Sequence, residues 1–238
     1  MRGLNRTNLA VGLMILGGLC AVAQKSAAQD LRLSFTVHIR NYAGVDSKTL
    51  EEAEKFAGGI FRKSGVETRW VAALGPSGEM PEAESIVELS GLSNLRLSIL
   101  PRGMSDRFRM RDTVMGLAPG SGENRHQIYV FYSKVEALAQ HPGNPCLAGP
   151  EYYSVTKALI LGHAIAHEIG HILLNLNIHT ANGIMRGNWN MNDLLEAASG
   201  RLVFSKGQAE VIRAEVARRM NQEEILQTAG VETVNTAR

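Results

Sequence analysis

Cysteine is nearly absent from this 238-residue chain, which contains Cys20 and Cys146 and no others. Cys20 lies in an N-terminal segment that we expect to be removed, so one cysteine remains and an intrachain disulfide is excluded. Fixed-period repeats and low-complexity blocks are also lacking, which argues against solenoid and fibrous proteins. An exported chain without a disulfide must rely on its apolar core or on a bound metal.

A long hydrophobic run of the kind that spans a membrane is missing as well. The apolar run Leu9–Val22 is shorter than the about 20 residues that a membrane-spanning helix needs. Arg2 and Arg6 precede this run, and small residues follow it up to Ala28. This order is typical of a secretory signal peptide. We therefore expect residues 1–28 to be a signal peptide and the protein to be secreted or periplasmic, with no stable membrane insertion after signal removal.

Two details of the signal segment leave alternatives open. Cleavage after Ala28 competes with cleavage after Ala23, because Ala21-Val22-Ala23 also fits the small-residue pattern. Cys20 raises a lipoprotein alternative, but bulky Leu19 precedes it where lipidation signals prefer a small residue.

An excess of charge of one sign is lacking too. Removing residues 1–28 takes away three basic residues and no acid, which leaves 22 basic and 23 acidic residues. A nearly neutral chain has no electrostatic footprint for nucleic acid, so we expect no nucleic-acid partner. Four arginines gather between 102 and 111, and we interpret them as a solvated loop.

Hydrophobic periodicity predicts strands followed by helices. The expected strands are 31–39, 66–71, 95–100, 114–120 and 127–132, with 114–120 as a short edge strand. The expected helices run from a cap at Asp46 or Ser47 to Gly65, from about 154 to 174, and onward from a capping box at Ser205 and Gln208. The strand–helix–strand order of the first three elements favours a parallel pair. The fold class is therefore α+β.

The chemistry is concentrated in the sequence HEIGH, which starts at His167. On a helix, His167 and His171 project from one face about one turn apart, so two imidazole nitrogens can meet one tetrahedral zinc ion. Glu168 follows the first histidine, where a general base beside a metal-bound water is required. A catalytic zinc needs a third protein ligand.

The alternative is an amphipathic helix that carries surface histidines by chance. The helix is flanked by isoleucines and leucines, which indicates a buried position. Burying two histidines and a glutamate without partners costs free energy, and a bound metal removes that cost. These residues therefore favour a zinc site.

Residues 167–185, HEIGHILLNLNIHTANGIM, resemble the metzincin clan of zinc metallopeptidases. The resemblance implies that His167, Glu168 and His171 match the family's first histidine, glutamate and second histidine. It also implies that Met185 is the methionine of the turn below the metal. The sequence departs from the family pattern at Leu174, where the family has glycine, and at Asn177, where it has the third histidine.

The third ligand implied by the resemblance is His179, which stands two residues late. The interval from His167 to Met185 nevertheless equals that of matrixin-type members. Asn175 and Asn177 are the non-glycine residues best able to adopt the left-handed turn that could return His179 to the metal. The alternative ligand is Glu196, which resembles the helical glutamate of thermolysin-like enzymes.

The resemblance also implies an architecture. We expect a zincin- or metzincin-like, twisted and mostly parallel sheet with an active-site helix and a small C-terminal helical subdomain. The catalytic domain would cover 29–225, with an upper lobe at about 29–175 and a lower lobe at about 176–225. Residues 226–238 are expected to be a frayed tail.

The sequence thus predicts a secreted zinc-dependent endopeptidase acting on a peptide or protein substrate. Zn²⁺ would be held by His167, His171 and His179, with Glu168 as the general base and Met185 as an apolar floor. The alternative is a non-catalytic zinc- or peptide-binding module on the same fold, which would have no need of Glu168. A chance motif in a structural protein is a third reading. The pattern specifies neither the oligomeric state nor the particular substrate.

Overall fold

The computed structural model describes most of the chain after its N-terminal segment. The described residues are 32–72, 91–108, 110–111, 114–119, 126–141, 150–175 and 179–235. Arg32–Arg238 forms one compact unit. The expected signal peptide, Cys146 and Asn177 lie outside the described residues.

Five strands form one sheet with the order β2-β1-β3-β5-β4. The strands are β1 (Ser34–Asn41), β2 (Glu67–Ala72), β3 (Asn94–Leu100), β4 (Gly116–Leu117) and β5 (Gln127–Phe131). β1, β2, β3 and β5 pair in parallel, whereas β4 pairs antiparallel with β5 at the edge. The expectation of a mostly parallel sheet with a short edge strand is confirmed, and the fold is a mixed α/β fold.

The helices are distributed along the whole described chain. They are α1 (Ser47–Lys63), α3 (Arg102–Ser105), the 3₁₀ turn η1 (Asp106–Phe108), α4 (Tyr132–Ala139), α5 (Pro150–Leu174), α6 (Met191–Ala198) and α7 (Lys206–Asn235). None of the helices in the described part of the chain combines the length and the apolarity needed to cross a bilayer.

α1 begins and ends where its sequence signals predict. The Asp46 side chain accepts a hydrogen bond from the Thr49 N–H at 2.9 Å, which satisfies one of the free donors of the first turn. Gly65 has φ 79°, a left-handed conformation that glycine adopts without a β-carbon clash, and the helix ends there. The buried face of α1 includes Ala57 and Phe61.

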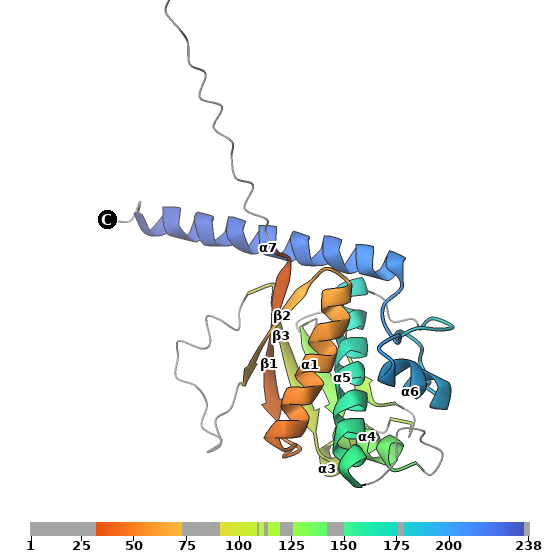
Figure 1. Ribbon diagram of the computed structural model, residues 1–238. Coiled ribbons are helices and arrows are strands. Elements are labelled where there is room, and N and C mark those ends of the chain that lie inside the picture. The colour runs from red at the N-terminus through yellow and green to blue at the C-terminus, as the bar shows by residue number, and fades with distance from the viewer. Residues whose placement is uncertain are drawn as a thin grey trace, which may run out of the picture. The chain divides into compact units, whose positions relative to one another are not determined.

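α1 and α5 lie side by side over one face of the sheet (Figure 1). Their backbones approach closely at Gly162 of α5, where a β-carbon would stand 2.5 Å from the carbonyl oxygen of Ala53 and 2.7 Å from Cβ of Phe56. α5 contacts β4 and β5 as well. Its second half, residues 158–174, is almost entirely buried, so the helix that carries the histidines is also the central helix of the core.

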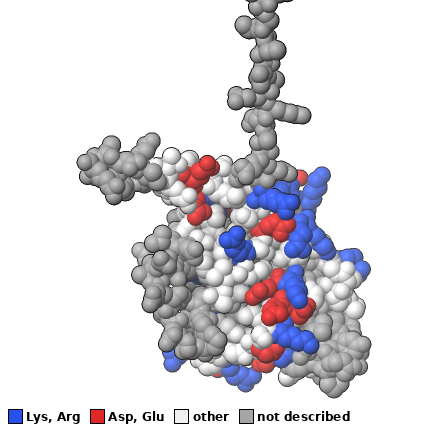
Figure 2. Space-filling view, turned by 60° about the vertical axis from the view of Figure 1, so that its left-hand side comes forward, with Lys and Arg blue, Asp and Glu red and all other residues white. Residues whose placement is uncertain are grey.

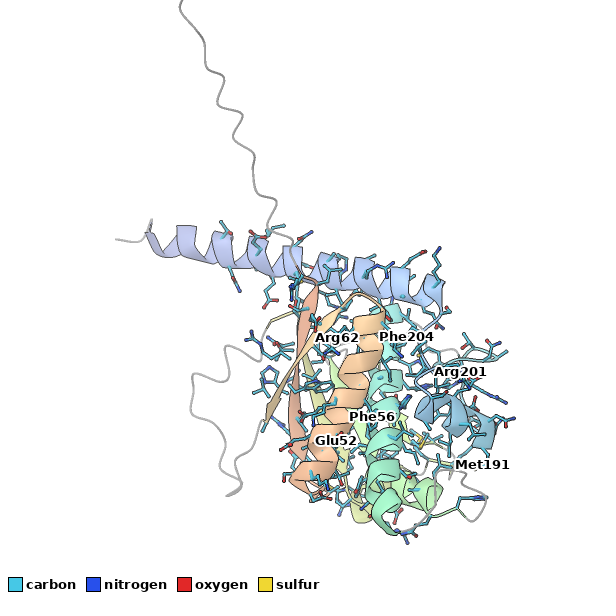
Figure 3. The ribbon with its side chains drawn as sticks, viewed as in Figure 1. Glu52, Phe56, Arg62, Met191, Arg201 and Phe204 are labelled. Atoms are coloured by element: carbon cyan, nitrogen blue, oxygen red, sulfur yellow. The ribbon has the colours of Figure 1, made fainter. Side chains whose placement is uncertain are left out.

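The segment after α6 packs back onto both central helices through Phe204. Its ring lies 5.3 Å from that of Phe61 on α1, and Figure 3 shows it at the upper ends of α1 and α5. The expected capping box then opens α7. The Ser205 N–H donates to Oε1 of Gln208, and the Gln208 N–H donates to Oγ of Ser205.

α7 is longer than expected, because it continues as a helix to Asn235, past the point where we expected a frayed tail. Its middle turn is held by a buried arginine. Arg219 donates to Glu215 at 2.7 Å and to the Leu92 carbonyl oxygen at 3.3 Å. On the face in Figure 2, lysines and arginines alternate with acids and do not gather into a patch of one sign.

Candidate metal centre

The last turns of α5 bring His167 and His171 together. Their Nε2 atoms are 3.1 Å apart, and their ring centroids are separated by 4.8 Å. Both residues are buried, at 7% and 8% exposure, and their rings meet edge to face. The helical spacing therefore produces the converging pair that the sequence predicts.

The chain turns sharply after α5 and returns toward the same pair. Asn175 has φ 50° and is the non-glycine residue with positive φ in the described part of the chain. Asparagine tolerates this conformation better than other residues with a β-carbon, which is the role expected of it here. After the turn, the His179 ring lies 5.3 Å from the ring of His167 and 5.0 Å from that of His171.

The three histidines form a group that can hold a metal ion. One nitrogen from each of His167, His171 and His179 lies within 4.8 Å of the others. In a tetrahedral zinc site with Zn–N bonds of 2.0–2.1 Å, neighbouring nitrogens would be about 3.4 Å apart. The 3.1 Å between the first pair is close to this value, and the nitrogen of the exposed His179 lies within 4.8 Å of both. The donor set is thus suited to zinc.

The alternative third ligand is placed elsewhere. Glu196 lies on α6 with its side chain exposed, because Leu194 and Ala197 form the buried face of that helix. Of the two candidates that the sequence leaves open, the fold brings His179 to the helix pair and leaves Glu196 in solvent.

The orientation of His167 is set by a backbone carbonyl. Its Nδ1 lies 2.7 Å from the Ile184 oxygen, so Nδ1 carries the proton and donates, and Nε2 keeps its lone pair on the side of His171. Trp189 donates from Nε1 to the same oxygen at 3.3 Å, and its ring packs 5.9 Å from the His167 ring. The role of Trp189 cannot be predicted from the sequence, because no local pattern links this residue to the helix.

The predicted methionine turn is a tight loop closed by backbone hydrogen bonds. The Thr180 N–H donates to the Met185 oxygen at 2.9 Å, and the Arg186 N–H donates to the Gly183 oxygen at 3.1 Å. Gly183 has φ 75°, which this reversal requires. The Met185 side chain is buried against α5, where a β-carbon on Gly170 would stand 2.6 Å from its sulfur. Met185 therefore packs beside the helix turn that carries His171.

A second glycine lets the backbone pass beside the third histidine. A β-carbon on Gly187 would stand 2.8 Å from Cγ and from Nδ1 of His179. Any larger residue at this position would push the His179 ring away from its present place, so Gly187 contributes to the site by having no side chain.

Glu168 is buried beside the histidines, with 6% of its surface exposed. Burial raises the pKa of its carboxyl to about 8, because the charged form is poorly solvated there. A cation held by the histidines would lower the pKa of this carboxyl, because its positive charge stabilises the carboxylate. The carboxyl lies under β4, where a β-carbon on Gly116 would stand 2.6 Å from Oε1.

A cleft of about 300 Å³ opens over the histidines and Glu168. It is lined by 114–119 around β4, by α5, and by the segment that carries His179, Arg186 and Trp189. Because β4 is the last strand in the sheet order, one of its edges has no strand partner among the described residues. The cleft is mainly apolar apart from the histidines, Glu168 and Arg186.

His163 belongs to the core next to the site and not to the three-histidine group. Its Nδ1 donates to the Leu159 oxygen at 2.8 Å, and its ring packs near Phe56 and Trp189. Burial lowers its pKa to about 4, partly offset by that hydrogen bond. His163 is therefore occupied by its own hydrogen bond and lies outside the three-histidine group.

Comparison with known proteins gives one structural likeness. No protein-family model and no curated protein matches the chain. The chain is similar to the crystal structure of archaemetzincin from Methanopyrus kandleri, with 17% sequence identity and a TM-score of 0.41 over 77% of this chain and 96% of that chain. A likeness of this size does not define a family for the chain.

Proposed function

We propose that the chain is a zinc-dependent endopeptidase that is exported and cleaves peptide bonds. The observation that carries the proposal is the convergence of His167, His171 and His179 in a cleft that also holds the carboxyl of Glu168. A site that only stored zinc would have no use for a buried carboxyl beside an open coordination position.

The ligand roles follow from the donor chemistry of the chain. His167, His171 and His179 would hold the ion through one imidazole nitrogen each, and the cleft would leave the fourth position open. Zinc in such a site supplies a Lewis acid that polarises a carbonyl group and lowers the pKa of a coordinated water. The Ile184 carbonyl keeps His167 in the tautomer that a ligand needs.

Glu168 would act as the general base and acid. Its carboxylate takes the proton of the attacking water, and the resulting carboxyl donates that proton to the leaving amine. A buried carboxyl favours its protonated form more than an exposed one does, which helps it to hold the proton between these two events. Met185 makes an apolar floor beside α5 and has no part in proton transfer.

The edge of β4 is suited to an extended peptide. An exposed strand edge captures peptides by main-chain hydrogen bonds, and this edge adjoins the cleft that contains Glu168. The backbone of a peptide bound there would pass next to the three histidines. This arrangement favours a peptide or protein substrate over a small metabolite.

The test uses the mature chain from residue 29. We expect the purified protein to contain close to one zinc per chain and to cleave members of a peptide library, with loss of cleavage when a chelator removes the metal. Glu168→Gln should retain the zinc and lose hydrolysis by about 10²–10⁴-fold, because glutamine keeps the shape and removes the base.

The same experiment separates the alternative function. Zinc and peptide binding without cleavage by the parent protein would identify a non-catalytic binding module. Cleavage by Glu168→Gln at the parent rate would contradict the mechanism. As a matched control, Glu196→Gln removes an exposed acid of α6 and should retain both zinc and hydrolysis.

A further inference from the structure

We infer that Arg186 is a specificity residue of the cleft and that it binds a carboxylate of the peptide substrate, an inference that rests on the proposed function. Arg186 follows the methionine turn directly and lines the cleft together with Gly187 and His179. About a third of its side chain, 36%, is exposed, so the guanidinium group is anchored but accessible.

The anchor is a buried carboxylate on α6. Nη1 of Arg186 lies 3.3 Å from Oδ2 of Asp193, whose side chain is only 7% exposed. Among the described residues, the hydrogen bonds that Arg186 donates from its side chain come from Nη1, so Nε and Nη2 are donors for a ligand. An arginine fixed through one nitrogen keeps its planar fork in a defined orientation, which lowers the entropy lost on binding.

Asp193 does not depend on Arg186 alone. Its Oδ2 accepts a hydrogen bond from the Asn190 N–H at 2.7 Å as part of the capping box of α6. The carboxylate also stands in the first turn of that helix, where the partial positive charge of the N-terminus stabilises an anion. Because these groups compensate Asp193, the positive charge of Arg186 stays available to a second carboxylate.

Arg186 differs from the other residues of the cleft in its charge. Among the described residues that line the cleft, Arg186 is the one with a permanent positive charge, and most of its neighbours are apolar. A charge-assisted hydrogen bond is stronger than a neutral one, and the guanidinium fork matches a carboxylate in geometry. Such a carboxylate can come from an aspartate or glutamate side chain or from the C-terminus of a peptide.

The experiment measures peptide binding and is independent of turnover. The mature, zinc-loaded chain carries Glu168→Gln so that bound peptides stay intact. Two sets of labelled peptides are compared by fluorescence polarisation: C-terminally amidated peptides with Glu or Gln at one position, and peptides without acidic side chains that end in a free acid or an amide. We expect the carboxylate member of at least one set to bind about 10-fold or more tightly than its neutral match.

Substitution of the arginine should remove this preference. In Arg186→Gln the ratio between matched peptides should fall to about 1, and in Arg186→Lys it should be intermediate because the charge stays and the fork is lost. Arg201→Gln is the matched control, since it removes an exposed arginine that does not line the cleft. Circular dichroism and zinc content establish that each variant is folded.

The outcomes separate the two proposals. Equal binding of all matched pairs, with cleavage by the parent protein intact, would overturn the carboxylate inference and leave the peptidase function standing. A preference that survives in Arg186→Gln would also overturn it. If no peptide binds and the parent protein cleaves none, the peptidase function fails and the inference fails with it. If Arg186→Gln does not fold, two measurements still test the inference. They are the ratio of carboxylate to neutral peptide binding in the protein that keeps Arg186, and the change of that ratio in Arg186→Lys.

Discussion

Gly116 of β4 lies directly against Glu168 of α5, so that a β-carbon on Gly116 would stand 2.5 Å from Cγ of the glutamate. This contact covers the carboxyl on the side of the sheet edge and accounts for part of its burial. The residue that we assign as the general base is therefore positioned by a glycine 52 residues earlier in the chain.

Gly116→Ala should displace the Glu168 carboxyl or push β4 outward while leaving the three histidines in place. A misplacement of about 1 Å can cost about 10²-fold in rate, and we expect a loss of that order in kcat/KM with zinc content unchanged. Gly103→Ala is the control, because a β-carbon there meets nothing within 4 Å. Full activity in Gly116→Ala would show that the contact does not position the base.

His179→Ala should weaken zinc binding strongly, because the two remaining histidines cannot fix a catalytic geometry alone. Glu196→Gln should leave the zinc dissociation constant near that of the parent protein, since the Glu196 side chain is exposed on α6. Competition with a chelating dye measures both constants. Loss of zinc from Glu196→Gln with retention in His179→Ala would replace the metzincin resemblance with the thermolysin-like alternative.

A bound peptidic inhibitor should protect the β4 edge from hydrogen exchange. An extended ligand added to the sheet would bond to the backbone between Met115 and Ala118 and slow the exchange of amides there. The β2 edge at the other end of the sheet order serves as the internal control, because it lies away from the cleft. Unchanged exchange at 114–119 would count against strand addition.

Acid should destabilise the metal-free protein partly through His163. Its pKa is about 4 in the folded state and about 6.5 in an unfolded chain, so the unfolded chain binds more protons between these values. The contribution of His163 to stability is therefore complete above about pH 6.5 and is lost as the pH approaches 4, a change of up to about 3 kcal/mol. Phe56 and Trp189 face the His163 ring. The positive charge of Lys63 also lowers the pKa of His163.

Urea unfolding in the presence of a chelator, at several pH values from 4 to 7, tests this expectation. His163→Gln should lose less stability across that range than the parent protein does, even if its stability at pH 7 is lower. Equal slopes for the two proteins would mean that the protonation of His163 does not contribute to acid unfolding.

The strands and helices that could be predicted are those whose boundaries are marked by nearby residues. Alternation located β1, the Asp46 cap and Gly65 bounded α1, and the capping box at Ser205 located the start of α7. α4 was missed because its N-cap position, Phe131, makes no side-chain capping bond and continues the apolar run of β5. A strand signal therefore hid the start of the helix.

The candidate site was predictable where it lies on one helix and less so where segments meet. The spacing of His167 and His171 fixes their geometry, whereas Gly116, Gly187 and Trp189 act through contacts with residues far along the chain or across a turn. The asparagine turn was anticipated at Asn175 from the conformational preference of the residue type. The anchoring of Arg186 by Asp193 had no signal, because neither residue belongs to a recognised pattern.

The division of the three histidines between a buried helix and an exposed segment would link the lifetime of a zinc-binding protein to the supply of the metal. His167 and His171 belong to the core helix α5, while His179 is exposed and follows the turn at Asn175. An ion that binds the folded chain at 100 times its dissociation constant adds about 2.7 kcal/mol to the free energy of unfolding. If the chain binds zinc as we propose, scarcity of the metal would remove this contribution and favour local opening and proteolysis around His179, so that the amount of intact protein would follow the availability of zinc.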